Sequence, residues 1–287
     1  MSFTFKITVA YDGTDFVGWQ RQRSGTSIQG LLEDALRELD QRDVTVTGAG
    51  RTDAGVHALG QVASFSIDRA MDAGALVGAL TARLPATVRV LAADPVPSTF
   101  HARYGATSKT YRYRIWNGEV LDPFVRLYAW HLIGALDVDS MAEAARILEG
   151  RRDFAAFQAA GSSTTTTERE VFSSRIIETL STTEDAEDTE AQSLEKPKMG
   201  LRVPRVLRGG ELVEYEIRGD GFLRHMVRAI VGSLVEIGRG RRPVEWMAQV
   251  LASRDRAQGG PTAPAHGLTL VEVAYGDGRP GFLADRR

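Results

Sequence analysis

Residues 48–65 read Gly48-Ala-Gly-Arg-Thr-Asp-Ala-Gly-Val-His-Ala-Leu-Gly-Gln-Val-Ala-Ser-Phe65. Glycine recurs through the first part of this stretch, and glycine permits positive φ angles and close approach of another backbone or a ligand. Residues 61–65 alternate between apolar and polar side chains, as in a strand that enters a sheet. The sequence therefore predicts a tight loop at the edge of a folded core, with Asp53 displayed on that loop.

Arg51 stands two residues before Asp53, and a cation at that distance favours the charged carboxylate that a nucleophile or general base requires. A purely structural interpretation is an Asx turn at Asp53, because aspartate and glycine dominate turns for local hydrogen-bonding reasons. The spacing alone leaves both interpretations open.

A family resemblance favours the first interpretation. Gly50-Arg-Thr-Asp-Ala-Gly-Val-His-Ala58 resembles the signature of the tRNA pseudouridine synthase A family, in which the aspartate of this motif is catalytic. Four further stretches resemble other motifs of that family, in the family's order: Tyr11-Asp-Gly-Thr-Asp-Phe-Val-Gly-Trp-Gln-Arg-Gln22, Phe100-His-Ala-Arg103 with Lys109-Thr-Tyr-Arg-Tyr-Arg-Ile115, Gly221-Phe-Leu-Arg-His-Met-Val-Arg-Ala-Ile-Val-Gly232, and Thr262-Ala-Pro-Ala-His-Gly-Leu-Thr-Leu270. The resemblance covers nearly the whole chain apart from a segment near residues 181–209.

Strands and helices alternate along both halves of the chain, which predicts an α+β protein with two related strand-helix-strand domains and mostly antiparallel sheets. The resemblance implies that the sheets join and leave a central active-site cleft. We place the boundary near residue 105, so that residues 1–105 hold the catalytic aspartate loop and residues 106–287 form the second domain. An acidic insertion near residues 181–209 has few apolar side chains, which predicts a mobile loop there.

The elements follow from periodicity. Alternation predicts strands at residues 3–11, 171–177 and 212–217, and it puts Tyr111, Tyr113 and Ile115 on one face of another strand. Helical spacing predicts a helix that begins at Thr26, with Gln29 completing a capping box. Further helices are expected at residues 73–83, 139–148, 222–237 and, opened by Pro243, 243–251. Residues 92–98 are typical of a connector.

Composition narrows the class of protein. The chain has 287 residues, of which 43% are hydrophobic, enough for one large or two medium domains. It has no apolar run long enough to span a bilayer and no signal peptide, so we expect no membrane partner. The absence of cysteine excludes disulfides, fits a cytoplasmic location and leaves an oxygen or nitrogen group as nucleophile. No histidine pair has a metal-ligand spacing and no glycine-rich nucleotide motif is present, so we predict neither metal nor cofactor.

The net charge of −2 at first argues against a nucleic-acid partner. Residues 184–196, however, hold six acids and one lysine, so the rest of the chain carries a net +3. Only four of the 35 basic residues are lysines, and arginine favours bidentate phosphate contacts and stacking on bases. A GC-rich genome explains the same preference. The charge therefore permits RNA binding without requiring it.

The resemblance implies isomerisation of uridine to pseudouridine at about positions 38 to 40 of the tRNA anticodon stem-loop. This reaction breaks the C1′–N1 bond, rotates the uracil and joins C1′ to C5. The Asp53 carboxylate assists by attacking C6, by attacking C1′ or by deprotonating C2′ on the way to a glycal, and the residues do not choose between these routes. A bond that departs from C1′ develops oxocarbenium-like charge, which a nearby carboxylate stabilises.

Tyr111 is the candidate for stacking on the target base, since the resemblance puts the active-site tyrosine there and its hydroxyl orients the ring. The alternative is a core tyrosine, a role that also suits Tyr113. By the same resemblance Leu268 packs against the uracil, and ordinary core packing is the alternative.

Arg228 has mostly apolar neighbours at helical spacing, and a buried arginine requires an acid partner. The resemblance names Asp53 as that acid, while Arg224, one turn earlier, leaves open a solvated face. Five arginines are candidate phosphate contacts, each with a solvated surface charge as its alternative: Arg21, Arg23, Arg51, Arg103 and Arg224.

We therefore expect an enzyme that acts on tRNA and, by resemblance, forms a homodimer. One alternative is a pseudouridine synthase for other RNA uridines. Another is a catalytically silent RNA-binding protein, although such a module has no use for an arginine-flanked carboxylate. A third, an N-glycosidic hydrolase, normally needs a second carboxylate, and none lies near Asp53 in the sequence.

Overall fold

The computed structural model describes residues 2–159, 161, 164, 166–178 and 210–276. The described strands form one sheet in the order β4-β1-β3-β10-β5-β9-β8-β7, with β2 paired to β3 and β6 paired to β5. Most of its pairs are antiparallel, and the α+β class is confirmed. The acidic residues 181–204, expected to form a mobile loop, lie outside the described residues. No helix in the described ranges has the length and apolarity needed to cross a membrane.

The strands are β1 (Phe3–Tyr11), β2 (Thr47–Gly48), β3 (His57–Ile67), β4 (Val88–Pro95), β5 (Ala106–Asn117), β6 (Trp130–Leu132), β7 (Gly150–Asp153), β8 (Glu168–Glu178), β9 (Glu211–Gly219) and β10 (Leu268–Tyr275). The helices are α1 (Ile28–Asp40), α2 (Ala73–Thr81), α3 (Val138–Arg146), α4 (Met226–Gly238) and α5 (Trp246–Ser253). Three short 3-10 turns are present as well: η1 (Ala155–Phe157), η2 (Arg256–Gln258) and η3 (Ala265–Gly267). The strands expected at residues 3–11, 171–177 and 212–217 and the helix expected at 73–83 are confirmed.

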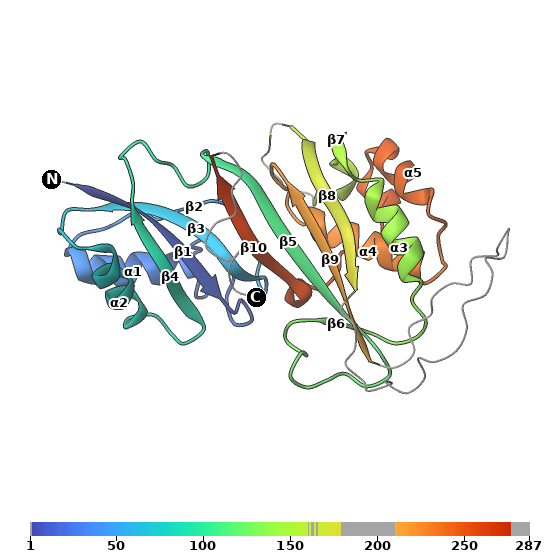
Figure 1. Cartoon of the computed structure of the whole chain (residues 1–287), viewed down its shortest axis with the longest axis horizontal. Coiled ribbons are helices and arrows are strands. Elements are labelled where there is room, and N and C mark those ends of the chain that lie inside the picture. The colour runs from blue at the N-terminus through green and yellow to red at the C-terminus, as the bar shows by residue number, and fades with distance from the viewer. Residues whose placement is uncertain (1, 160, 162–163, 165, 179–209, 277–287) are drawn as a thin grey trace, which may run out of the picture.

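The position of β10 joins the two halves of the sheet. This strand, the last in the described chain, lies between β3 and β5, and Figure 1 shows β10 and β5 side by side across the middle of the molecule. It pairs parallel with β3 at only two positions, Thr269 with His57 and Leu270 with Ala58, and antiparallel with β5 along most of its length. Because β10 pairs with both strands, it holds the loop before β3 close to the central strand β5.

The prediction of a connector at residues 92–98 is wrong for its first half. Ala92 to Pro95 belong to the edge strand β4, which pairs with β1. The chain then leaves this edge and re-enters the sheet at its centre as β5, beginning at Ala106. Alternating small and apolar residues are compatible with a half-buried edge strand. The prolines lie at the end of this strand, where no backbone N–H is needed for pairing with a neighbouring strand. The division of the chain into domains at residue 105 stays a prediction.

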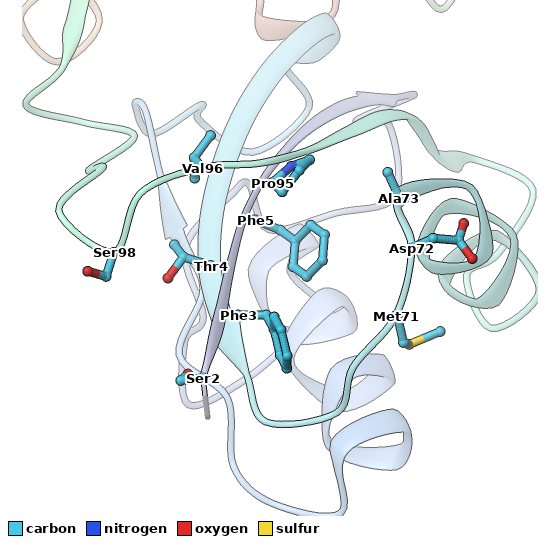
Figure 2. Close-up of a pocket in the computed structure, with 10 residues that line it drawn as sticks. All are labelled: Ser2, Phe3, Thr4, Phe5, Met71, Asp72, Ala73, Pro95, Val96 and Ser98. Atoms are coloured by element: carbon cyan, nitrogen blue, oxygen red, sulfur yellow. The ribbon is translucent and has the colours of Figure 1, made fainter.

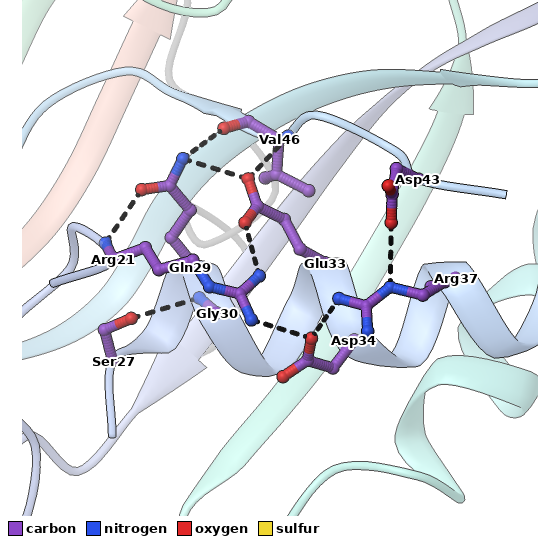
Figure 3. Close-up of polar contacts among 9 residues, drawn as sticks. All are labelled: Arg21, Ser27, Gln29, Gly30, Glu33, Asp34, Arg37, Asp43 and Val46. Carbon is purple, nitrogen blue, oxygen red and sulfur yellow. Dashed lines mark hydrogen bonds and ion pairs between the residues drawn. The ribbon is translucent and has the colours of Figure 1, made fainter. Parts of the chain in front are cut away.

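Helix α1 begins one residue later than expected. The hydroxyl of Ser27, not of Thr26, accepts the Gly30 N–H at 3.1 Å, so Ser27 is the cap (Figure 3). Gln29 is then the second helical residue instead of the third, and it cannot complete a capping box. Its amide instead donates to the Val46 carbonyl at 3.0 Å, which ties α1 to the strand-like segment before β2.

Helices α4 and α5 also begin later than expected. α4 starts at Met226 and not at Phe222, because His225 has a left-handed backbone with φ 61° that interrupts helical geometry. α5 starts at Trp246, and Pro243 instead forms the turn before it, accepting the Trp246 N–H. α3 begins one residue early, after the cap Asp137.

Residues 260–263 lie directly on α4. A side chain at Gly232 would collide with the Pro261 carbonyl, so glycine is required for this approach. The Ser233 hydroxyl accepts the Gly260 N–H at 2.9 Å, and the Ala263 N–H donates to the Arg228 carbonyl at 3.1 Å. This contact sets the position of Arg228.

Candidate active site

The loop that carries Asp53 is held by residues of the first motif. The Trp19 N–H donates to the Thr52 carbonyl at 3.1 Å, and the Tyr11 hydroxyl bonds the Thr52 hydroxyl at 2.8 Å. A side chain at Gly18 would meet the Thr52 carbonyl at 2.6 Å, so the two loops pack backbone to backbone. Gly55 takes a φ of 78°, a conformation that favours glycine. Asp53 is therefore displayed on a backbone that is fixed on both sides.

Asp53 contacts the other described side chains through one of its two carboxylate oxygens. Arg228 Nη1 lies 3.2 Å and His225 Nε2 lies 3.4 Å from Oδ2. No described residue hydrogen-bonds to Oδ1, and the side chain keeps 30% exposure. The carboxylate is thus oriented through Oδ2. The ion pair between Arg228 and Asp53 that the resemblance implied is present.

Arg51, expected to supply the cation beside Asp53, forms no direct ion pair with it in the structure. Arg51 is exposed and forms no hydrogen bond or ion pair with any described residue. The cation that contacts Asp53 is instead Arg228, which α4 delivers from a distant part of the sequence. Arg228 is only 15% exposed, and its Nε donates to the Ala263 carbonyl at 2.7 Å. Its guanidinium is therefore fixed at two points.

Sequence reasoning missed His225. This residue caps α4 with φ 61°, and the strained turn carries its ring to Asp53. Burial lowers the pKa of His225, Arg228 and Arg224 lower it further, and the charge of Asp53 opposes them. The ring is therefore neutral at neutral pH. Its position three residues before Arg228, within one family motif, was the available signal.

Tyr111 and Tyr113 are both buried, and they differ in what their hydroxyls contact; the stacking role of Tyr111 stays a prediction. Tyr113 has no exposed surface, and its hydroxyl donates to the Pro264 carbonyl at 2.9 Å, as a core tyrosine does. The Tyr111 ring packs edge-on against Phe222 at 5.2 Å, and no described residue hydrogen-bonds to its hydroxyl. Burial raises the pKa of Tyr111, and Tyr11 and the charge of Asp53 raise it further, so the phenol stays protonated.

Leu268 is the first residue of β10 and is paired in register with Tyr113. It is 5% exposed and belongs to the core that continues beneath the site. Its expected contact with uracil stays a prediction.

The candidate phosphate contacts have different surroundings. Arg21 is engaged, since Nη1 pairs with Glu33 at 3.0 Å and Nη2 with Asp34 at 2.9 Å (Figure 3). Arg23 and Arg103 are exposed, and the Arg103 guanidinium lies over the Tyr104 ring at 5.8 Å. Arg224 is close enough to His225 to lower its pKa. As phosphate contacts, all of them stay predictions.

Other features do not contribute to this site. Within the described residues no group of His, Asp and Glu side chains is arranged to hold a metal ion. A hollow of about 540 Å³ lies where β1 begins, between Phe3, Phe5, Met71 and Pro95 (Figure 2). None of its lining residues belongs to the group around Asp53.

Comparison with known proteins gives the class. A family described as tRNA pseudouridine synthase matches residues 7–105 and 144–276, the two segments that carry Asp53 and Arg228. The chain belongs to this family and is an isomerase.

Individual relatives agree. The chain is 43% identical over 270 residues to tRNA pseudouridine synthase A of Syntrophotalea carbinolica, covering 94% of this chain and 95% of that protein. It is 42% identical to the protein of the same name from Myxococcus xanthus, covering 96% and 93%, and 41% identical to that from Geobacter sulfurreducens, covering 95% and 99%.

Proposed function

We propose that this enzyme converts uridine to pseudouridine in the anticodon stem-loop of tRNA, at about positions 38 to 40, with Asp53 as the catalytic carboxylate. The observation that carries the proposal is the asymmetry of the Asp53 carboxylate: Arg228 donates to Oδ2, His225 Nε2 lies 3.4 Å from the same oxygen, and no described residue hydrogen-bonds to Oδ1. An oriented carboxylate whose second oxygen has no such contact suits each route to pseudouridine, whether it attacks C6 or C1′ or removes a proton from C2′.

The surrounding residues have roles that follow from their positions. Arg228 fixes Asp53 and stabilises its negative charge before the reaction. Tyr111, whose buried phenol stays protonated, stacks on the uracil and donates a hydrogen bond. Leu268 contacts the base from the end of β10. Arg51 and Arg224 flank Asp53 on its own loop and on the approach to α4, and they contact phosphates that position the RNA without reading its sequence.

Three further properties are part of the proposal. We place the domain boundary near residue 105, where the chain passes from β4 to β5. The resemblance supports a homodimer, and the absence of cysteine supports a cytoplasmic location. No cofactor takes part, because an aspartate and a flipped nucleotide suffice for the isomerisation.

The test is incubation with an unmodified tRNA transcript, followed by carbodiimide-dependent primer-extension mapping of pseudouridine. The expected result is new stops at positions 38 to 40 whose appearance requires Asp53. Stops at other positions would support a synthase for other uridines, and binding without any stop would support a silent RNA-binding protein. Release of free uracil would instead indicate a hydrolase.

A further inference from the structure

A lysine that forms no ion pair with any described residue lies beside the loop that carries Asp53. Lys109 is on β5 two residues before Tyr111, on the same face of the strand and about 7 Å from it along the strand. The end of its side chain lies against Gly50: a side chain there would be 3.4 Å from Cε and 3.7 Å from Nζ of Lys109. Gly50 is three residues before Asp53. The ammonium group therefore lies at the start of the loop that displays the catalytic carboxylate.

The charges around Lys109 are mostly positive. Burial lowers the pKa of Lys109, the nearby Arg103 and Arg169 lower it further, and Asp220 opposes them. Asp220 does not come within ion-pair distance of the ammonium, and its carboxylate accepts the Glu170 N–H at 3.1 Å. No described residue forms a hydrogen bond or ion pair with the Lys109 ammonium.

Lys6 provides the contrast. It is the other lysine in the described part of the chain, and its Nζ pairs with Asp94 at 2.9 Å. A half-buried cation without such a partner is costly, and two neighbouring arginines add to the cost. Clustered, uncompensated charges of this kind are typical of sites whose counter-ion is the ligand.

We propose that Lys109, together with Arg103 and Arg169, binds a backbone phosphate of the RNA next to the nucleotide that reacts at Asp53. The inference rests on the proposed function, which places RNA on this face of the loop. Arg103 is exposed, and Arg169 lies against Gly221 with its Nη1 donating to the Thr166 and Glu168 carbonyls. The three cations come from three segments: the stretch before β5, β5 itself and β8. A phosphate fits these cations because it accepts hydrogen bonds from several donors at once.

The structural alternative is that the aliphatic stem of Lys109 only covers Gly50. Lys109→Met keeps the length and apolar surface of the stem and removes the charge, and Lys109→Arg keeps the charge. Lys6→Met is the matched control, since it removes a lysine charge from a site away from Asp53. Arg103→Gln tests the contact with the same phosphate, and it should not affect folding because Arg103 is exposed.

The measurement is the dissociation constant for an unmodified anticodon stem-loop transcript across a range of salt concentrations, with melting temperature as the folding control. Lys109→Met should weaken binding about tenfold at low salt. It should also reduce the slope of log affinity against log salt by about 0.7 to 0.9. Arg103→Gln should reduce the slope as well, while Lys109→Arg and Lys6→Met should behave as the wild type.

A wild-type salt slope in both Lys109→Met and Arg103→Gln would overturn the proposal. So would an equal loss in Lys6→Met, which would show a general charge effect. If Lys109→Met does not fold, the salt slope of Arg103→Gln alone decides whether these residues bind a phosphate. If the wild type binds the stem-loop but makes no pseudouridine, the proposed function fails, and the salt slopes still test the phosphate contact.

Discussion

Arg228→Lys separates the orientation of Asp53 from the charge beside it. The arginine donates from Nε to the Ala263 carbonyl and from Nη1 to Asp53 Oδ2, at 2.7 Å and 3.2 Å. A lysine has a single point charge and reaches one of these oxygens at a time. The substitution therefore keeps the positive charge and removes the two-point attachment.

The magnitude follows from these two contacts. One charge-assisted hydrogen bond is lost, and such bonds contribute about 1.5–3 kcal/mol. The Arg228 side chain is 15% exposed, so water replaces little of this loss. For a protein of this size the melting temperature should fall by about 3–12 °C. A carboxylate displaced by about 1 Å should slow the chemical step about 100-fold.

The assay is single-turnover conversion of an unmodified tRNA transcript at saturating enzyme, with the melting temperature and the tRNA dissociation constant measured in parallel. Arg241→Lys is the control, because Arg241 is 57% exposed and pairs with Glu236 at the surface. We expect unchanged tRNA affinity for Arg228→Lys, because it removes no charge. A single-turnover rate within twofold of the wild type would refute the idea that Arg228 orients Asp53.

Further predictions concern the same site and its supports. Asp53→Asn should abolish pseudouridine formation and retain tRNA binding, because phosphate contacts dominate affinity; a near-wild-type single-turnover rate would exclude Asp53 as the catalytic group. Tyr111→Phe should keep base binding, and Tyr111→Ala should lose about 1–3 kcal/mol of it; a lower melting temperature with normal turnover in Tyr111→Ala would make the ring a core residue only. The pKa of His225 is lowered in the fold, so the unfolded chain takes up the proton first, and the stability present above about pH 6.5 should decline as the pH falls. The melting temperature of His225→Asn should therefore depend less on pH between about 7.5 and 5.5 than that of the wild type. An unchanged dependence would contradict a lowered pKa for His225. Gly232→Ala should destabilise the fold by about 2 kcal/mol or more, since its methyl group meets the Pro261 carbonyl. Gly78→Ala, which has open space around it in α2, should stabilise the fold by about 0.5–1 kcal/mol. Equal melting temperatures for the two variants would show that the packing of residues 260–263 does not require Gly232.

Local patterns predicted most elements but not their caps. β1 alternates cleanly because one of its faces, formed by Phe5, Ile7, Val9 and Tyr11, is buried in the core. Thr26 and Ser27 are adjacent and chemically similar as caps, so the local sequence does not choose between them, and in the structure the Ser27 hydroxyl accepts the Gly30 N–H. His225 looks helical because its neighbours are, and its left-handed φ depends on packing that no local pattern encodes.

The site was predictable through motifs and not through spacing. Asp53 and Arg228 are far apart in the chain, so their ion pair was predicted from the family resemblance, and the structure contains it. Spacing alone pointed to Arg51, which the loop turns outward. The pairing of β10 with β3 at two positions was also beyond the sequence, because so short a parallel contact leaves no periodic signal.

The insertion of β10 at the centre of the sheet makes the order of synthesis matter. Residues 260–275 supply the Ala263 carbonyl that fixes Arg228, the Pro264 carbonyl that receives Tyr113 and the strand between β3 and β5. A ribosome-bound chain that ends before this segment therefore holds Asp53, Tyr111 and Arg228 without the element that aligns them. Contacts of such large sequence separation form slowly, since loop closure must precede them. The nascent enzyme should consequently stay inactive until this last stretch emerges, and a ribosome stalled near residue 255 should carry a folded N-terminal half with no isomerase activity.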